Sequence, residues 1–113
     1  MSIYRSREVK PSTHLGCFTD RGGEERIFAD KARSSSQMTS ERCNSECAGF
    51  SYYGMQYETQ CWCGGADADH DQHGESTGCT TPCPGNDDET CGGAWSVDVY
   101  RFGDPAPPPP TPP

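Results

Sequence analysis

The stretch Cys43-Asn-Ser-Glu-Cys47 and the shorter motif Cys61-Trp-Cys63 decide the fold of this chain. Two cysteines four residues apart share one face of a helix and lie roughly 6 Å apart along its axis. Two cysteines separated by one residue share one face of a strand, roughly 6.6 Å apart. The two spacings nearly match, so they predict a helix joined to a strand by two adjacent disulfides. They leave open whether the two bridges run parallel or crossed.

Eight cysteines in 113 residues, with only 31% hydrophobic residues, indicate a small domain stabilised by disulfides. Such a chain buries too little apolar surface to offset its conformational entropy comfortably, and each native bridge contributes about 2–5 kcal/mol. Disulfides persist in oxidising compartments, so we expect a secreted or extracellular protein. Zinc is the alternative for paired cysteines, but Cys61-Trp-Cys63 is too tight for the usual zinc spacing. We therefore expect no metal and no cofactor.

The formal net charge of −8 argues against nucleic acid as a partner, because phosphate binding needs a basic patch. Seven acidic residues and no Lys or Arg lie between Gly64 and Gly92, a composition that disfavours sulfated or phosphorylated ligands and tolerates neutral ones. No apolar run approaches the roughly 20 residues of a membrane-spanning helix. The N-terminus lacks the apolar segment of a signal peptide, so for a secreted protein we expect a mature fragment.

Composition divides the chain into three parts. Residues 1–13 mix charged residues with a proline and are expected to be a tether, and residues 14–103 hold every cysteine. Residues 104–113 are mostly proline, which excludes helix and sheet and favours a stiff polyproline spacer. We therefore expect a single disulfide-rich domain linked to another domain through the proline-rich tail.

The domain is expected to begin and end with strands. Residues 14–20 read as the first strand and 96–102 as the last, with Val97 and Val99 on one face. A helix is expected to begin after Thr39, which can cap it, and to end at Gly49.

A hairpin is expected directly after this helix. Residues 50–57 and 60–63 provide its two strands, with a turn near Glu58-Thr59. The remainder up to Trp95 is expected to be loop, held by its cysteines.

The order of the motifs along the chain carries the most specific signal. In sequence order they include Gly16-Cys17, Cys43-x3-Cys47, Cys61-x-Cys63-Gly64, Cys79-x3-Cys83 and Glu89-x-Cys91-Gly-Gly93. This order closely resembles the WSC domain, a family named after fungal cell-wall integrity and stress-response components. The resemblance spans about residues 14–102 and includes all eight cysteines. The chain departs from the family at Gly65, where Asn is frequent, and at Trp62, where Tyr is commoner.

The resemblance implies a small disulfide-rich α+β fold, in which an antiparallel sheet has one or two helices packed on it. It also implies four disulfides, Cys17–Cys79, Cys43–Cys61, Cys47–Cys63 and Cys83–Cys91. Without the resemblance, the sequence alone cannot choose this set from the roughly 105 possible connectivities of eight cysteines.

The function implied by the resemblance is that of a non-catalytic module. It would bind cell-wall polysaccharide, with β-1,3-glucan the first candidate and xylan or chitin the next, and would anchor a secreted fungal protein or enzyme to the wall. The alternative is a protein-interaction or self-association module of a cell-surface sensor or receptor.

Aromatic side chains are the candidates for sugar binding, because sugar rings present apolar faces that stack on aromatic rings while nearby polar groups bond to the hydroxyls. Each of these aromatics is equally compatible with a place in the core of a small domain. The candidate binding residues are Trp62, Tyr57, Tyr53, Tyr52, Gln56 and Trp95.

Strand alternation ranks these candidates. Cys61 and Cys63 must face the helix, so Trp62 must point away from it, which we expect to mean toward solvent. A hairpin loop with an even number of residues would place Tyr53, Met55 and Tyr57 on the Trp62 face. An odd number would place Tyr52 and Gln56 there instead. Trp62 is the first candidate in both cases.

Two further patterns are expected to carry no chemistry. Asp67-Ala-Asp69-His-Asp71 imitates the opening of a calcium-binding loop but lacks its glycine and its closing glutamate, so we expect a solvated acidic loop. Catalysis is not expected, because bridged cysteines leave no thiol nucleophile and the three histidines have no evident catalytic partner.

Overall fold

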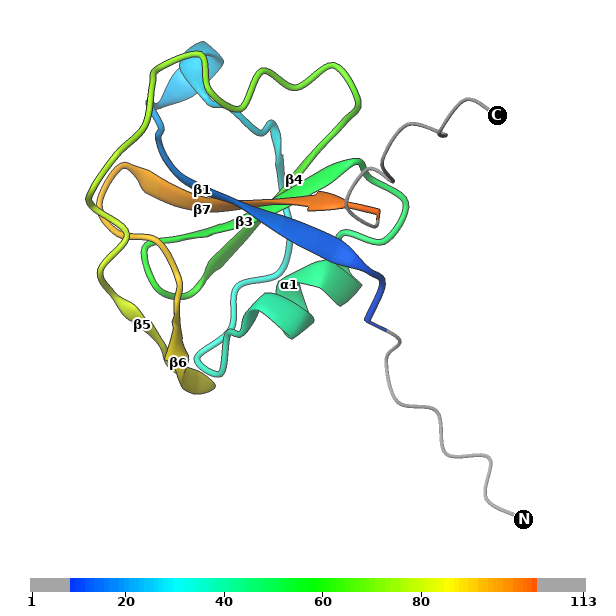
Figure 1. Ribbon diagram of the computed structural model, residues 1–113, viewed down its shortest axis with the longest axis vertical. Helices are drawn as coiled ribbons and strands as arrows, with labels where there is room; N and C mark the ends of the chain where they lie inside the picture. The colour runs from blue at the N-terminus through cyan, green and yellow to red at the C-terminus, as the bar shows by residue number, and fades with distance from the viewer. Residues whose placement is uncertain (1–8, 104–113) are drawn as a thin grey trace, which may run out of the picture.

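A five-stranded antiparallel sheet forms the centre of the computed structural model, which describes residues 9–103 (Figure 1). The strand order is β1-β7-β3-β4-β2, and a separate two-stranded ribbon pairs β5 with β6. The predicted fold class is confirmed, with one helix on the sheet and four disulfides. The elements are β1 (Ser12–Thr19), the 3-10 turn η1 (Gly23–Glu25), β2 (Asp30–Lys31), α1 (Ser40–Glu46), β3 (Tyr52–Gln56), β4 (Gln60–Gly64), β5 (Pro82–Cys83), β6 (Asn86–Thr90) and β7 (Ser96–Phe102).

The predicted tether and linker fall largely outside the described residues. The proline-rich segment 104–113 is not described, and neither are residues 1–8 of the tether. The first strand begins at Ser12, two residues before the predicted start of the domain. Pro11 accepts a hydrogen bond from the backbone of Gly103 at 2.8 Å, so the ends of the folded part lie side by side.

Helix α1 begins where the sequence predicts. The Thr39 hydroxyl accepts a hydrogen bond from the backbone N–H of Arg42 at 3.0 Å, which satisfies one of the free donors of the first turn. Met38, just before the cap, is fully buried in the same cluster as Cys43. The helix ends at Glu46, and Gly49 follows with a φ of 96°, a conformation that glycine adopts without steric cost.

The two central disulfides run parallel between α1 and β4. Cys43 bonds to Cys61 and Cys47 to Cys63, with Cα–Cα distances of 5.4 and 5.3 Å. Matching spacing on the helix and the strand therefore fixes α1 along one face of the sheet. The other two bridges are Cys17–Cys79 and Cys83–Cys91, so all four disulfides are those that the resemblance implied.

The β3–β4 hairpin has a loop of three residues, 57–59, because Gln56 pairs with Gln60. The odd alternative is therefore the observed one. Tyr52 and Gln56 share the face of Trp62, and the intervening Tyr53 and Met55 lie on the face that carries α1.

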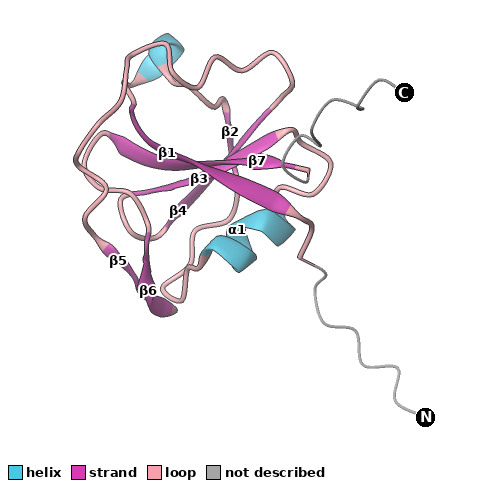
Figure 2. Cartoon of the chain, viewed as in Figure 1, coloured by secondary structure: helices cyan, strands magenta, loops and turns pink. Residues whose placement is uncertain are grey.

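The sheet has an apolar cluster on each face, and only one of them is covered by the helix. Figure 2 shows α1 on one side of the strands, with η1 and the loops beyond it on the other. The helix side contains Met38, Tyr53, Met55 and six of the cysteines. The opposite side contains Phe18, Ile27, Phe28, Trp62, Val97 and Val99.

The segment that follows η1 covers this second face. Ile27 and Phe28 are buried, and β2 joins the segment to the edge of the sheet by pairing with β4. Phe28 lies so close to the backbone of β4 that a Cβ at Gly64 would collide with its ring. A loop thus closes the face that has no helix.

Four short elements, η1, β2, β5 and β6, were not predicted from the sequence. The segment 64–95 was expected to be loop throughout, but it contains the β5–β6 ribbon, which Cys83–Cys91 closes. The strand β2, only two residues long, gives too short a pattern to be recognised. Within residues 9–103, no helix has the length and apolar character needed to cross a membrane.

Candidate functional site

Trp62 points away from the helix, as predicted, but the expectation that it faces solvent is wrong. Trp62 is only 8% exposed, because the segment after η1 packs on this face of the sheet. The guanidinium of Arg26 lies 3.9 Å from the centroid of its ring. The indole Nε1 donates a hydrogen bond to Gln60 Oε1 at 3.0 Å. Trp62 is therefore a floor beneath Arg26 and not an open stacking surface.

Tyr53 and Gln56 are also buried. Tyr53 stacks on Tyr100 with ring centroids 4.9 Å apart, and its hydroxyl is 2.8 Å from Ser12 Oγ. Burial raises the pKa of the Tyr53 hydroxyl. Gln56 accepts a hydrogen bond through Oε1 from Arg26 Nη1 at 3.3 Å, and its Nε2 is buried without a partner in the described chain.

Tyr52 lies at the opposite end of β3 from the hairpin loop. It is partly buried, with its ring 5.8 Å from that of Phe28 and 5.5 Å from that of His70. It also lines a pocket of 440 Å³ in which the exposed ring is Phe50, at 37% exposure. Tyr52 therefore belongs to a different surface from the hairpin loop.

Trp95 and Tyr57 are the predicted residues that form an accessible aromatic pair. Trp95 is 46% exposed, and Tyr57 is partly exposed with its ring centroid 5.7 Å away in an edge-to-face arrangement. Both come from turns at one end of the sheet, next to the end of β3 and the beginning of β7.

The backbone at this pair is held in an unusual conformation. Within residues 9–103, the non-glycine residues with positive φ are Tyr57 (52°), Glu58 (70°) and Trp95 (51°). The surrounding chain holds them there: Trp95 accepts a hydrogen bond from the backbone of Asp20 at 2.9 Å, and Glu58 donates one to Cys91 at 3.0 Å. Strained residues of this kind cluster at functional sites, where the fold pays for precise placement.

Arg26 joins the exposed pair to the buried floor. Its guanidinium lies 3.9 Å from the Trp62 ring centroid and 5.7 Å from that of Trp95. Nη1 forms an ion pair of 3.0 Å with the buried carboxylate of Asp20. The other oxygen of this carboxylate accepts backbone hydrogen bonds from Arg21 and Ile27, both at 2.9 Å. Arg26 is thus held in position by the Asp20 carboxylate, which is itself fixed by backbone hydrogen bonds to its other oxygen.

We call Trp95, Tyr57 and Arg26, with Trp62 and Gln56 beneath them, the Trp95 site. The sequence predicted four of these five residues as candidates, and it missed Arg26. Arg26 lies in a polar segment without periodicity, and only the packing of Ile27 and Phe28 brings it to the tryptophans. Tyr53 and Tyr52 were candidates that the structure places elsewhere. The role of all these residues in sugar binding stays a prediction.

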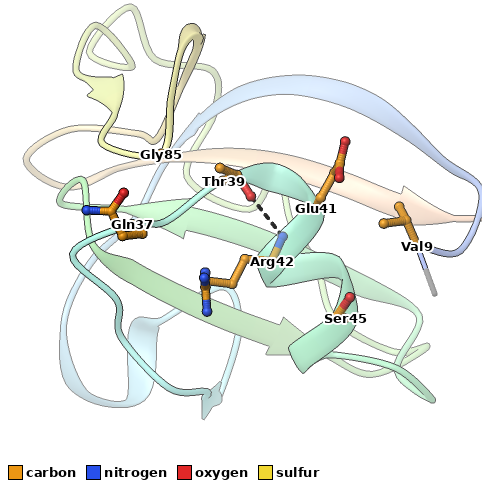
Figure 3. Close-up of a pocket in the computed structure, with 7 residues that line it drawn as sticks. All are labelled: Val9, Gln37, Thr39, Glu41, Arg42, Ser45 and Gly85. Carbon is orange, nitrogen blue, oxygen red and sulfur yellow. Dashed lines mark hydrogen bonds between the residues drawn. The ribbon is translucent and has the colours of Figure 1, made fainter. Parts of the chain in front are cut away.

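A second hollow lies along α1, but it has a different character (Figure 3). Its volume is 540 Å³, and its walls come from α1, the segment before the helix, the β5–β6 turn and the chain before β1. The residues that line it are Val9, Gln37, Thr39, Glu41, Arg42, Ser45 and Gly85. It has no aromatic ring on which a sugar could stack, so it is a poorer candidate.

The acidic loop and the cysteine cluster offer no better alternative. A hydrogen bond with Asp71 raises the pKa of Asp69, which is fully exposed. The sulfur atoms of Cys43, Cys47 and Cys61 lie within 4.8 Å of one another, a spacing that suits a metal ion. All three are in disulfides, so they have no thiolate to offer a metal.

Comparison with known proteins identifies relatives of the domain. The family model described as "WSC domain" matches residues 14–93. A "WSC domain-containing protein" of Arthroderma benhamiae is 33% identical over 89 residues, which cover 79% of this chain and 12% of that protein. "Protein SLG1" of Saccharomyces cerevisiae is 36% identical over 91 residues, covering 79% and 23%. "Xylosyltransferase sqv-6" of Caenorhabditis briggsae is 32% identical over 91 residues, covering 77% and 11%. The chain thus spans only a small part of each relative.

Proposed function

The chain belongs to the WSC domain family, and we propose that it is a non-catalytic module that binds a neutral cell-wall polysaccharide through the Trp95 site. The observation that carries this proposal is the 46% exposure of Trp95 in a strained turn, with Tyr57 at its edge. A large aromatic ring left open by a rigid backbone is suited to stack on the apolar face of a sugar.

The charges of the domain support a neutral ligand. The chain has a formal net charge of −8, and the positive charge of Arg26 is matched by the buried Asp20. A sulfated or phosphorylated glycan would therefore meet a surface of the same sign. Neutral wall polysaccharides avoid this repulsion, and β-1,3-glucan, xylan and chitin are the candidates.

The place of the module in a larger protein follows from its setting. All eight cysteines are in disulfides, which fits the extracellular or cell-surface setting typical of WSC domain proteins. We propose that the domain anchors a secreted fungal protein or enzyme to the wall, with the proline-rich tail as the spacer to its other domain.

A pull-down with insoluble β-1,3-glucan, xylan and chitin tests the proposal. The parent domain should be retained by one or more of these polymers, and Trp95→Ala should be washed off. Phe50→Ala is the matched control, because Phe50 is an exposed aromatic residue at the other end of β3. Failure of the parent domain to bind any of the polymers would refute the proposal.

Self-association is the second candidate function. Exposed aromatic rings at both ends of β3, Trp95 and Phe50, favour it, because such rings are common anchors of protein interfaces. Sedimentation over a range of concentrations distinguishes the two functions. A concentration-dependent dimer that binds no glycan would favour self-association.

A further inference from the structure

Arg26 is anchored by a single nitrogen of its guanidinium. Nη1 donates hydrogen bonds to Asp20 Oδ2 at 3.0 Å and to Gln56 Oε1 at 3.3 Å. The guanidinium carbon lies over the Trp62 ring, 3.9 Å from its centroid. The group is therefore held in position and orientation before any ligand arrives, which lowers the entropy cost of binding.

The remaining donors of Arg26 are free and reach solvent. Nε and Nη2 donate no hydrogen bond to the described part of the chain. Neither nitrogen is fully buried, so both remain accessible to water. The side chain keeps 22% of its surface exposed. The guanidinium carbon to which both nitrogens are bonded lies 5.7 Å from the ring centroid of Trp95.

We propose that Arg26 is a ligand-binding residue that donates hydrogen bonds from Nε and Nη2 to two adjacent hydroxyls of a sugar ring stacked on Trp95. This inference rests on the proposed function and specifies its ligand. The guanidinium offers donors in a rigid planar fork, which matches two neighbouring oxygen atoms better than a single one. Because Asp20 already compensates its charge, the fork suits neutral hydroxyls.

The fork distinguishes glycans by their linkage. A β-1,4-linked glucose or xylose residue within a chain keeps its 2- and 3-hydroxyls free and adjacent. Within a β-1,3-glucan the 3-oxygen is part of the linkage, so inner residues have no such pair. The site therefore selects β-1,4-linked glucose or xylose residues, whose 2- and 3-hydroxyls are free, over pure β-1,3-glucan. This places xylan ahead of the β-1,3-glucan that the family resemblance put first.

Affinity electrophoresis with two soluble glucans tests this selectivity. Mixed-linkage β-1,3/1,4-glucan contains the adjacent hydroxyls and pure β-1,3-glucan lacks them inside the chain, although both are made only of glucose. We expect the parent domain to bind the mixed-linkage glucan roughly tenfold more tightly, as two hydrogen bonds imply. The parent's selectivity needs no variant, so it is decisive even where a substitution prevents folding.

Arg26→Lys keeps the positive charge but removes the fork, so it should abolish the preference for the mixed-linkage glucan. Arg101→Lys is the matched control, because Arg101 is an exposed arginine at the far end of the sheet. Trp95→Ala should weaken the binding of both glucans to the same extent.

Equal or tighter binding of pure β-1,3-glucan by the parent overturns the role of Arg26. So does an Arg26→Lys variant that keeps the preference or loses both glucans equally. In these cases binding that depends on Trp95 still supports the proposed function. The absence of binding to these glucans, to xylan and to chitin refutes the proposed function itself.

Discussion

Replacing Trp95 with alanine should weaken glycan binding and leave the stability of the fold nearly unchanged. Replacing Trp62 with alanine should instead lower the stability of the fold. Both are tryptophans next to Arg26, at 5.7 and 3.9 Å from its guanidinium carbon. They differ in exposure, with Trp95 at 46% and Trp62 at 8%. The ring that is open to solvent can stack on a ligand, whereas the covered ring can only support the fold.

The exposed fraction sets the size of the effect on binding. An aromatic side chain has up to about 250 Å² of surface, so 46% exposure leaves roughly 115 Å² of Trp95 accessible. A sugar ring covers one face, about half of this area, which at 25 cal/mol per Å² amounts to about 1.5 kcal/mol. Trp95→Ala should therefore weaken glycan binding about tenfold, with little change in the free energy of unfolding.

Trp62→Ala removes a buried ring, and substitutions of this kind cost about 3–5 kcal/mol of stability. Urea unfolding of both variants, followed by glycan titration of those that remain folded, measures the two effects. A Trp95→Ala variant that binds normally would refute the assignment of the stacking surface. A Trp62→Ala variant as stable as the parent would refute the burial of the second face.

Three further predictions concern stability. Burial raises the pKa of Tyr100 above its ordinary value of 10.0, with the charge of Glu89 adding to the effect. As the pH rises, the unfolded chain then loses the Tyr100 hydroxyl proton before the folded chain does, so the free energy of unfolding should stay level below about pH 10 and fall above it. Thermal melts at alkaline pH measure this, and a free energy that stays level above about pH 10 would contradict it. Gly92→Ala should destabilise the domain by about 1–3 kcal/mol in thermal melts, because φ is 74° and a Cβ would collide with two backbone carbonyls; an unchanged melting temperature would contradict it. Replacing Cys17 and Cys79 together with serine opens a loop of 62 residues and should cost about 4 kcal/mol in urea unfolding, and a cost below about 1 kcal/mol would show that the loop is held by other contacts.

The helix face of the domain was predictable because its constraints are local and covalent. The spacing of Cys43 and Cys47 on a helix and of Cys61 and Cys63 on a strand requires the two elements to lie together. The direction of Trp62 follows from the same alternation, and the structure confirms it. Which tyrosines share its face depended on the number of residues in the hairpin loop. That number was not predictable, because the loop uses left-handed backbone at Tyr57 and Glu58, where no glycine signals it.

The opposite face was not predictable, because a loop covers it and gives no periodic signal. Ile27 and Phe28 are two apolar residues in a polar segment, and β2 is only two residues long. Nothing in their spacing shows that they pack over the sheet, since contacts between distant segments depend on the whole fold. The exposure of Trp62 was inferred from its direction alone, and direction does not determine exposure when a loop can supply a third layer.

The same loop that buries Trp62 also creates the binding site we propose. A small sheet has two apolar faces, and here α1 with its disulfides covers one of them, so the segment after η1 must cover the other. Seating Ile27 and Phe28 on that face leaves Arg26 at the margin of the covering layer, where it rests on Trp62 and reaches Trp95. The accessible aromatic ring lies just beyond this margin. In the function we propose, ligand recognition would therefore be coupled to the packing of the second face, and Arg26 would be the residue that connects them.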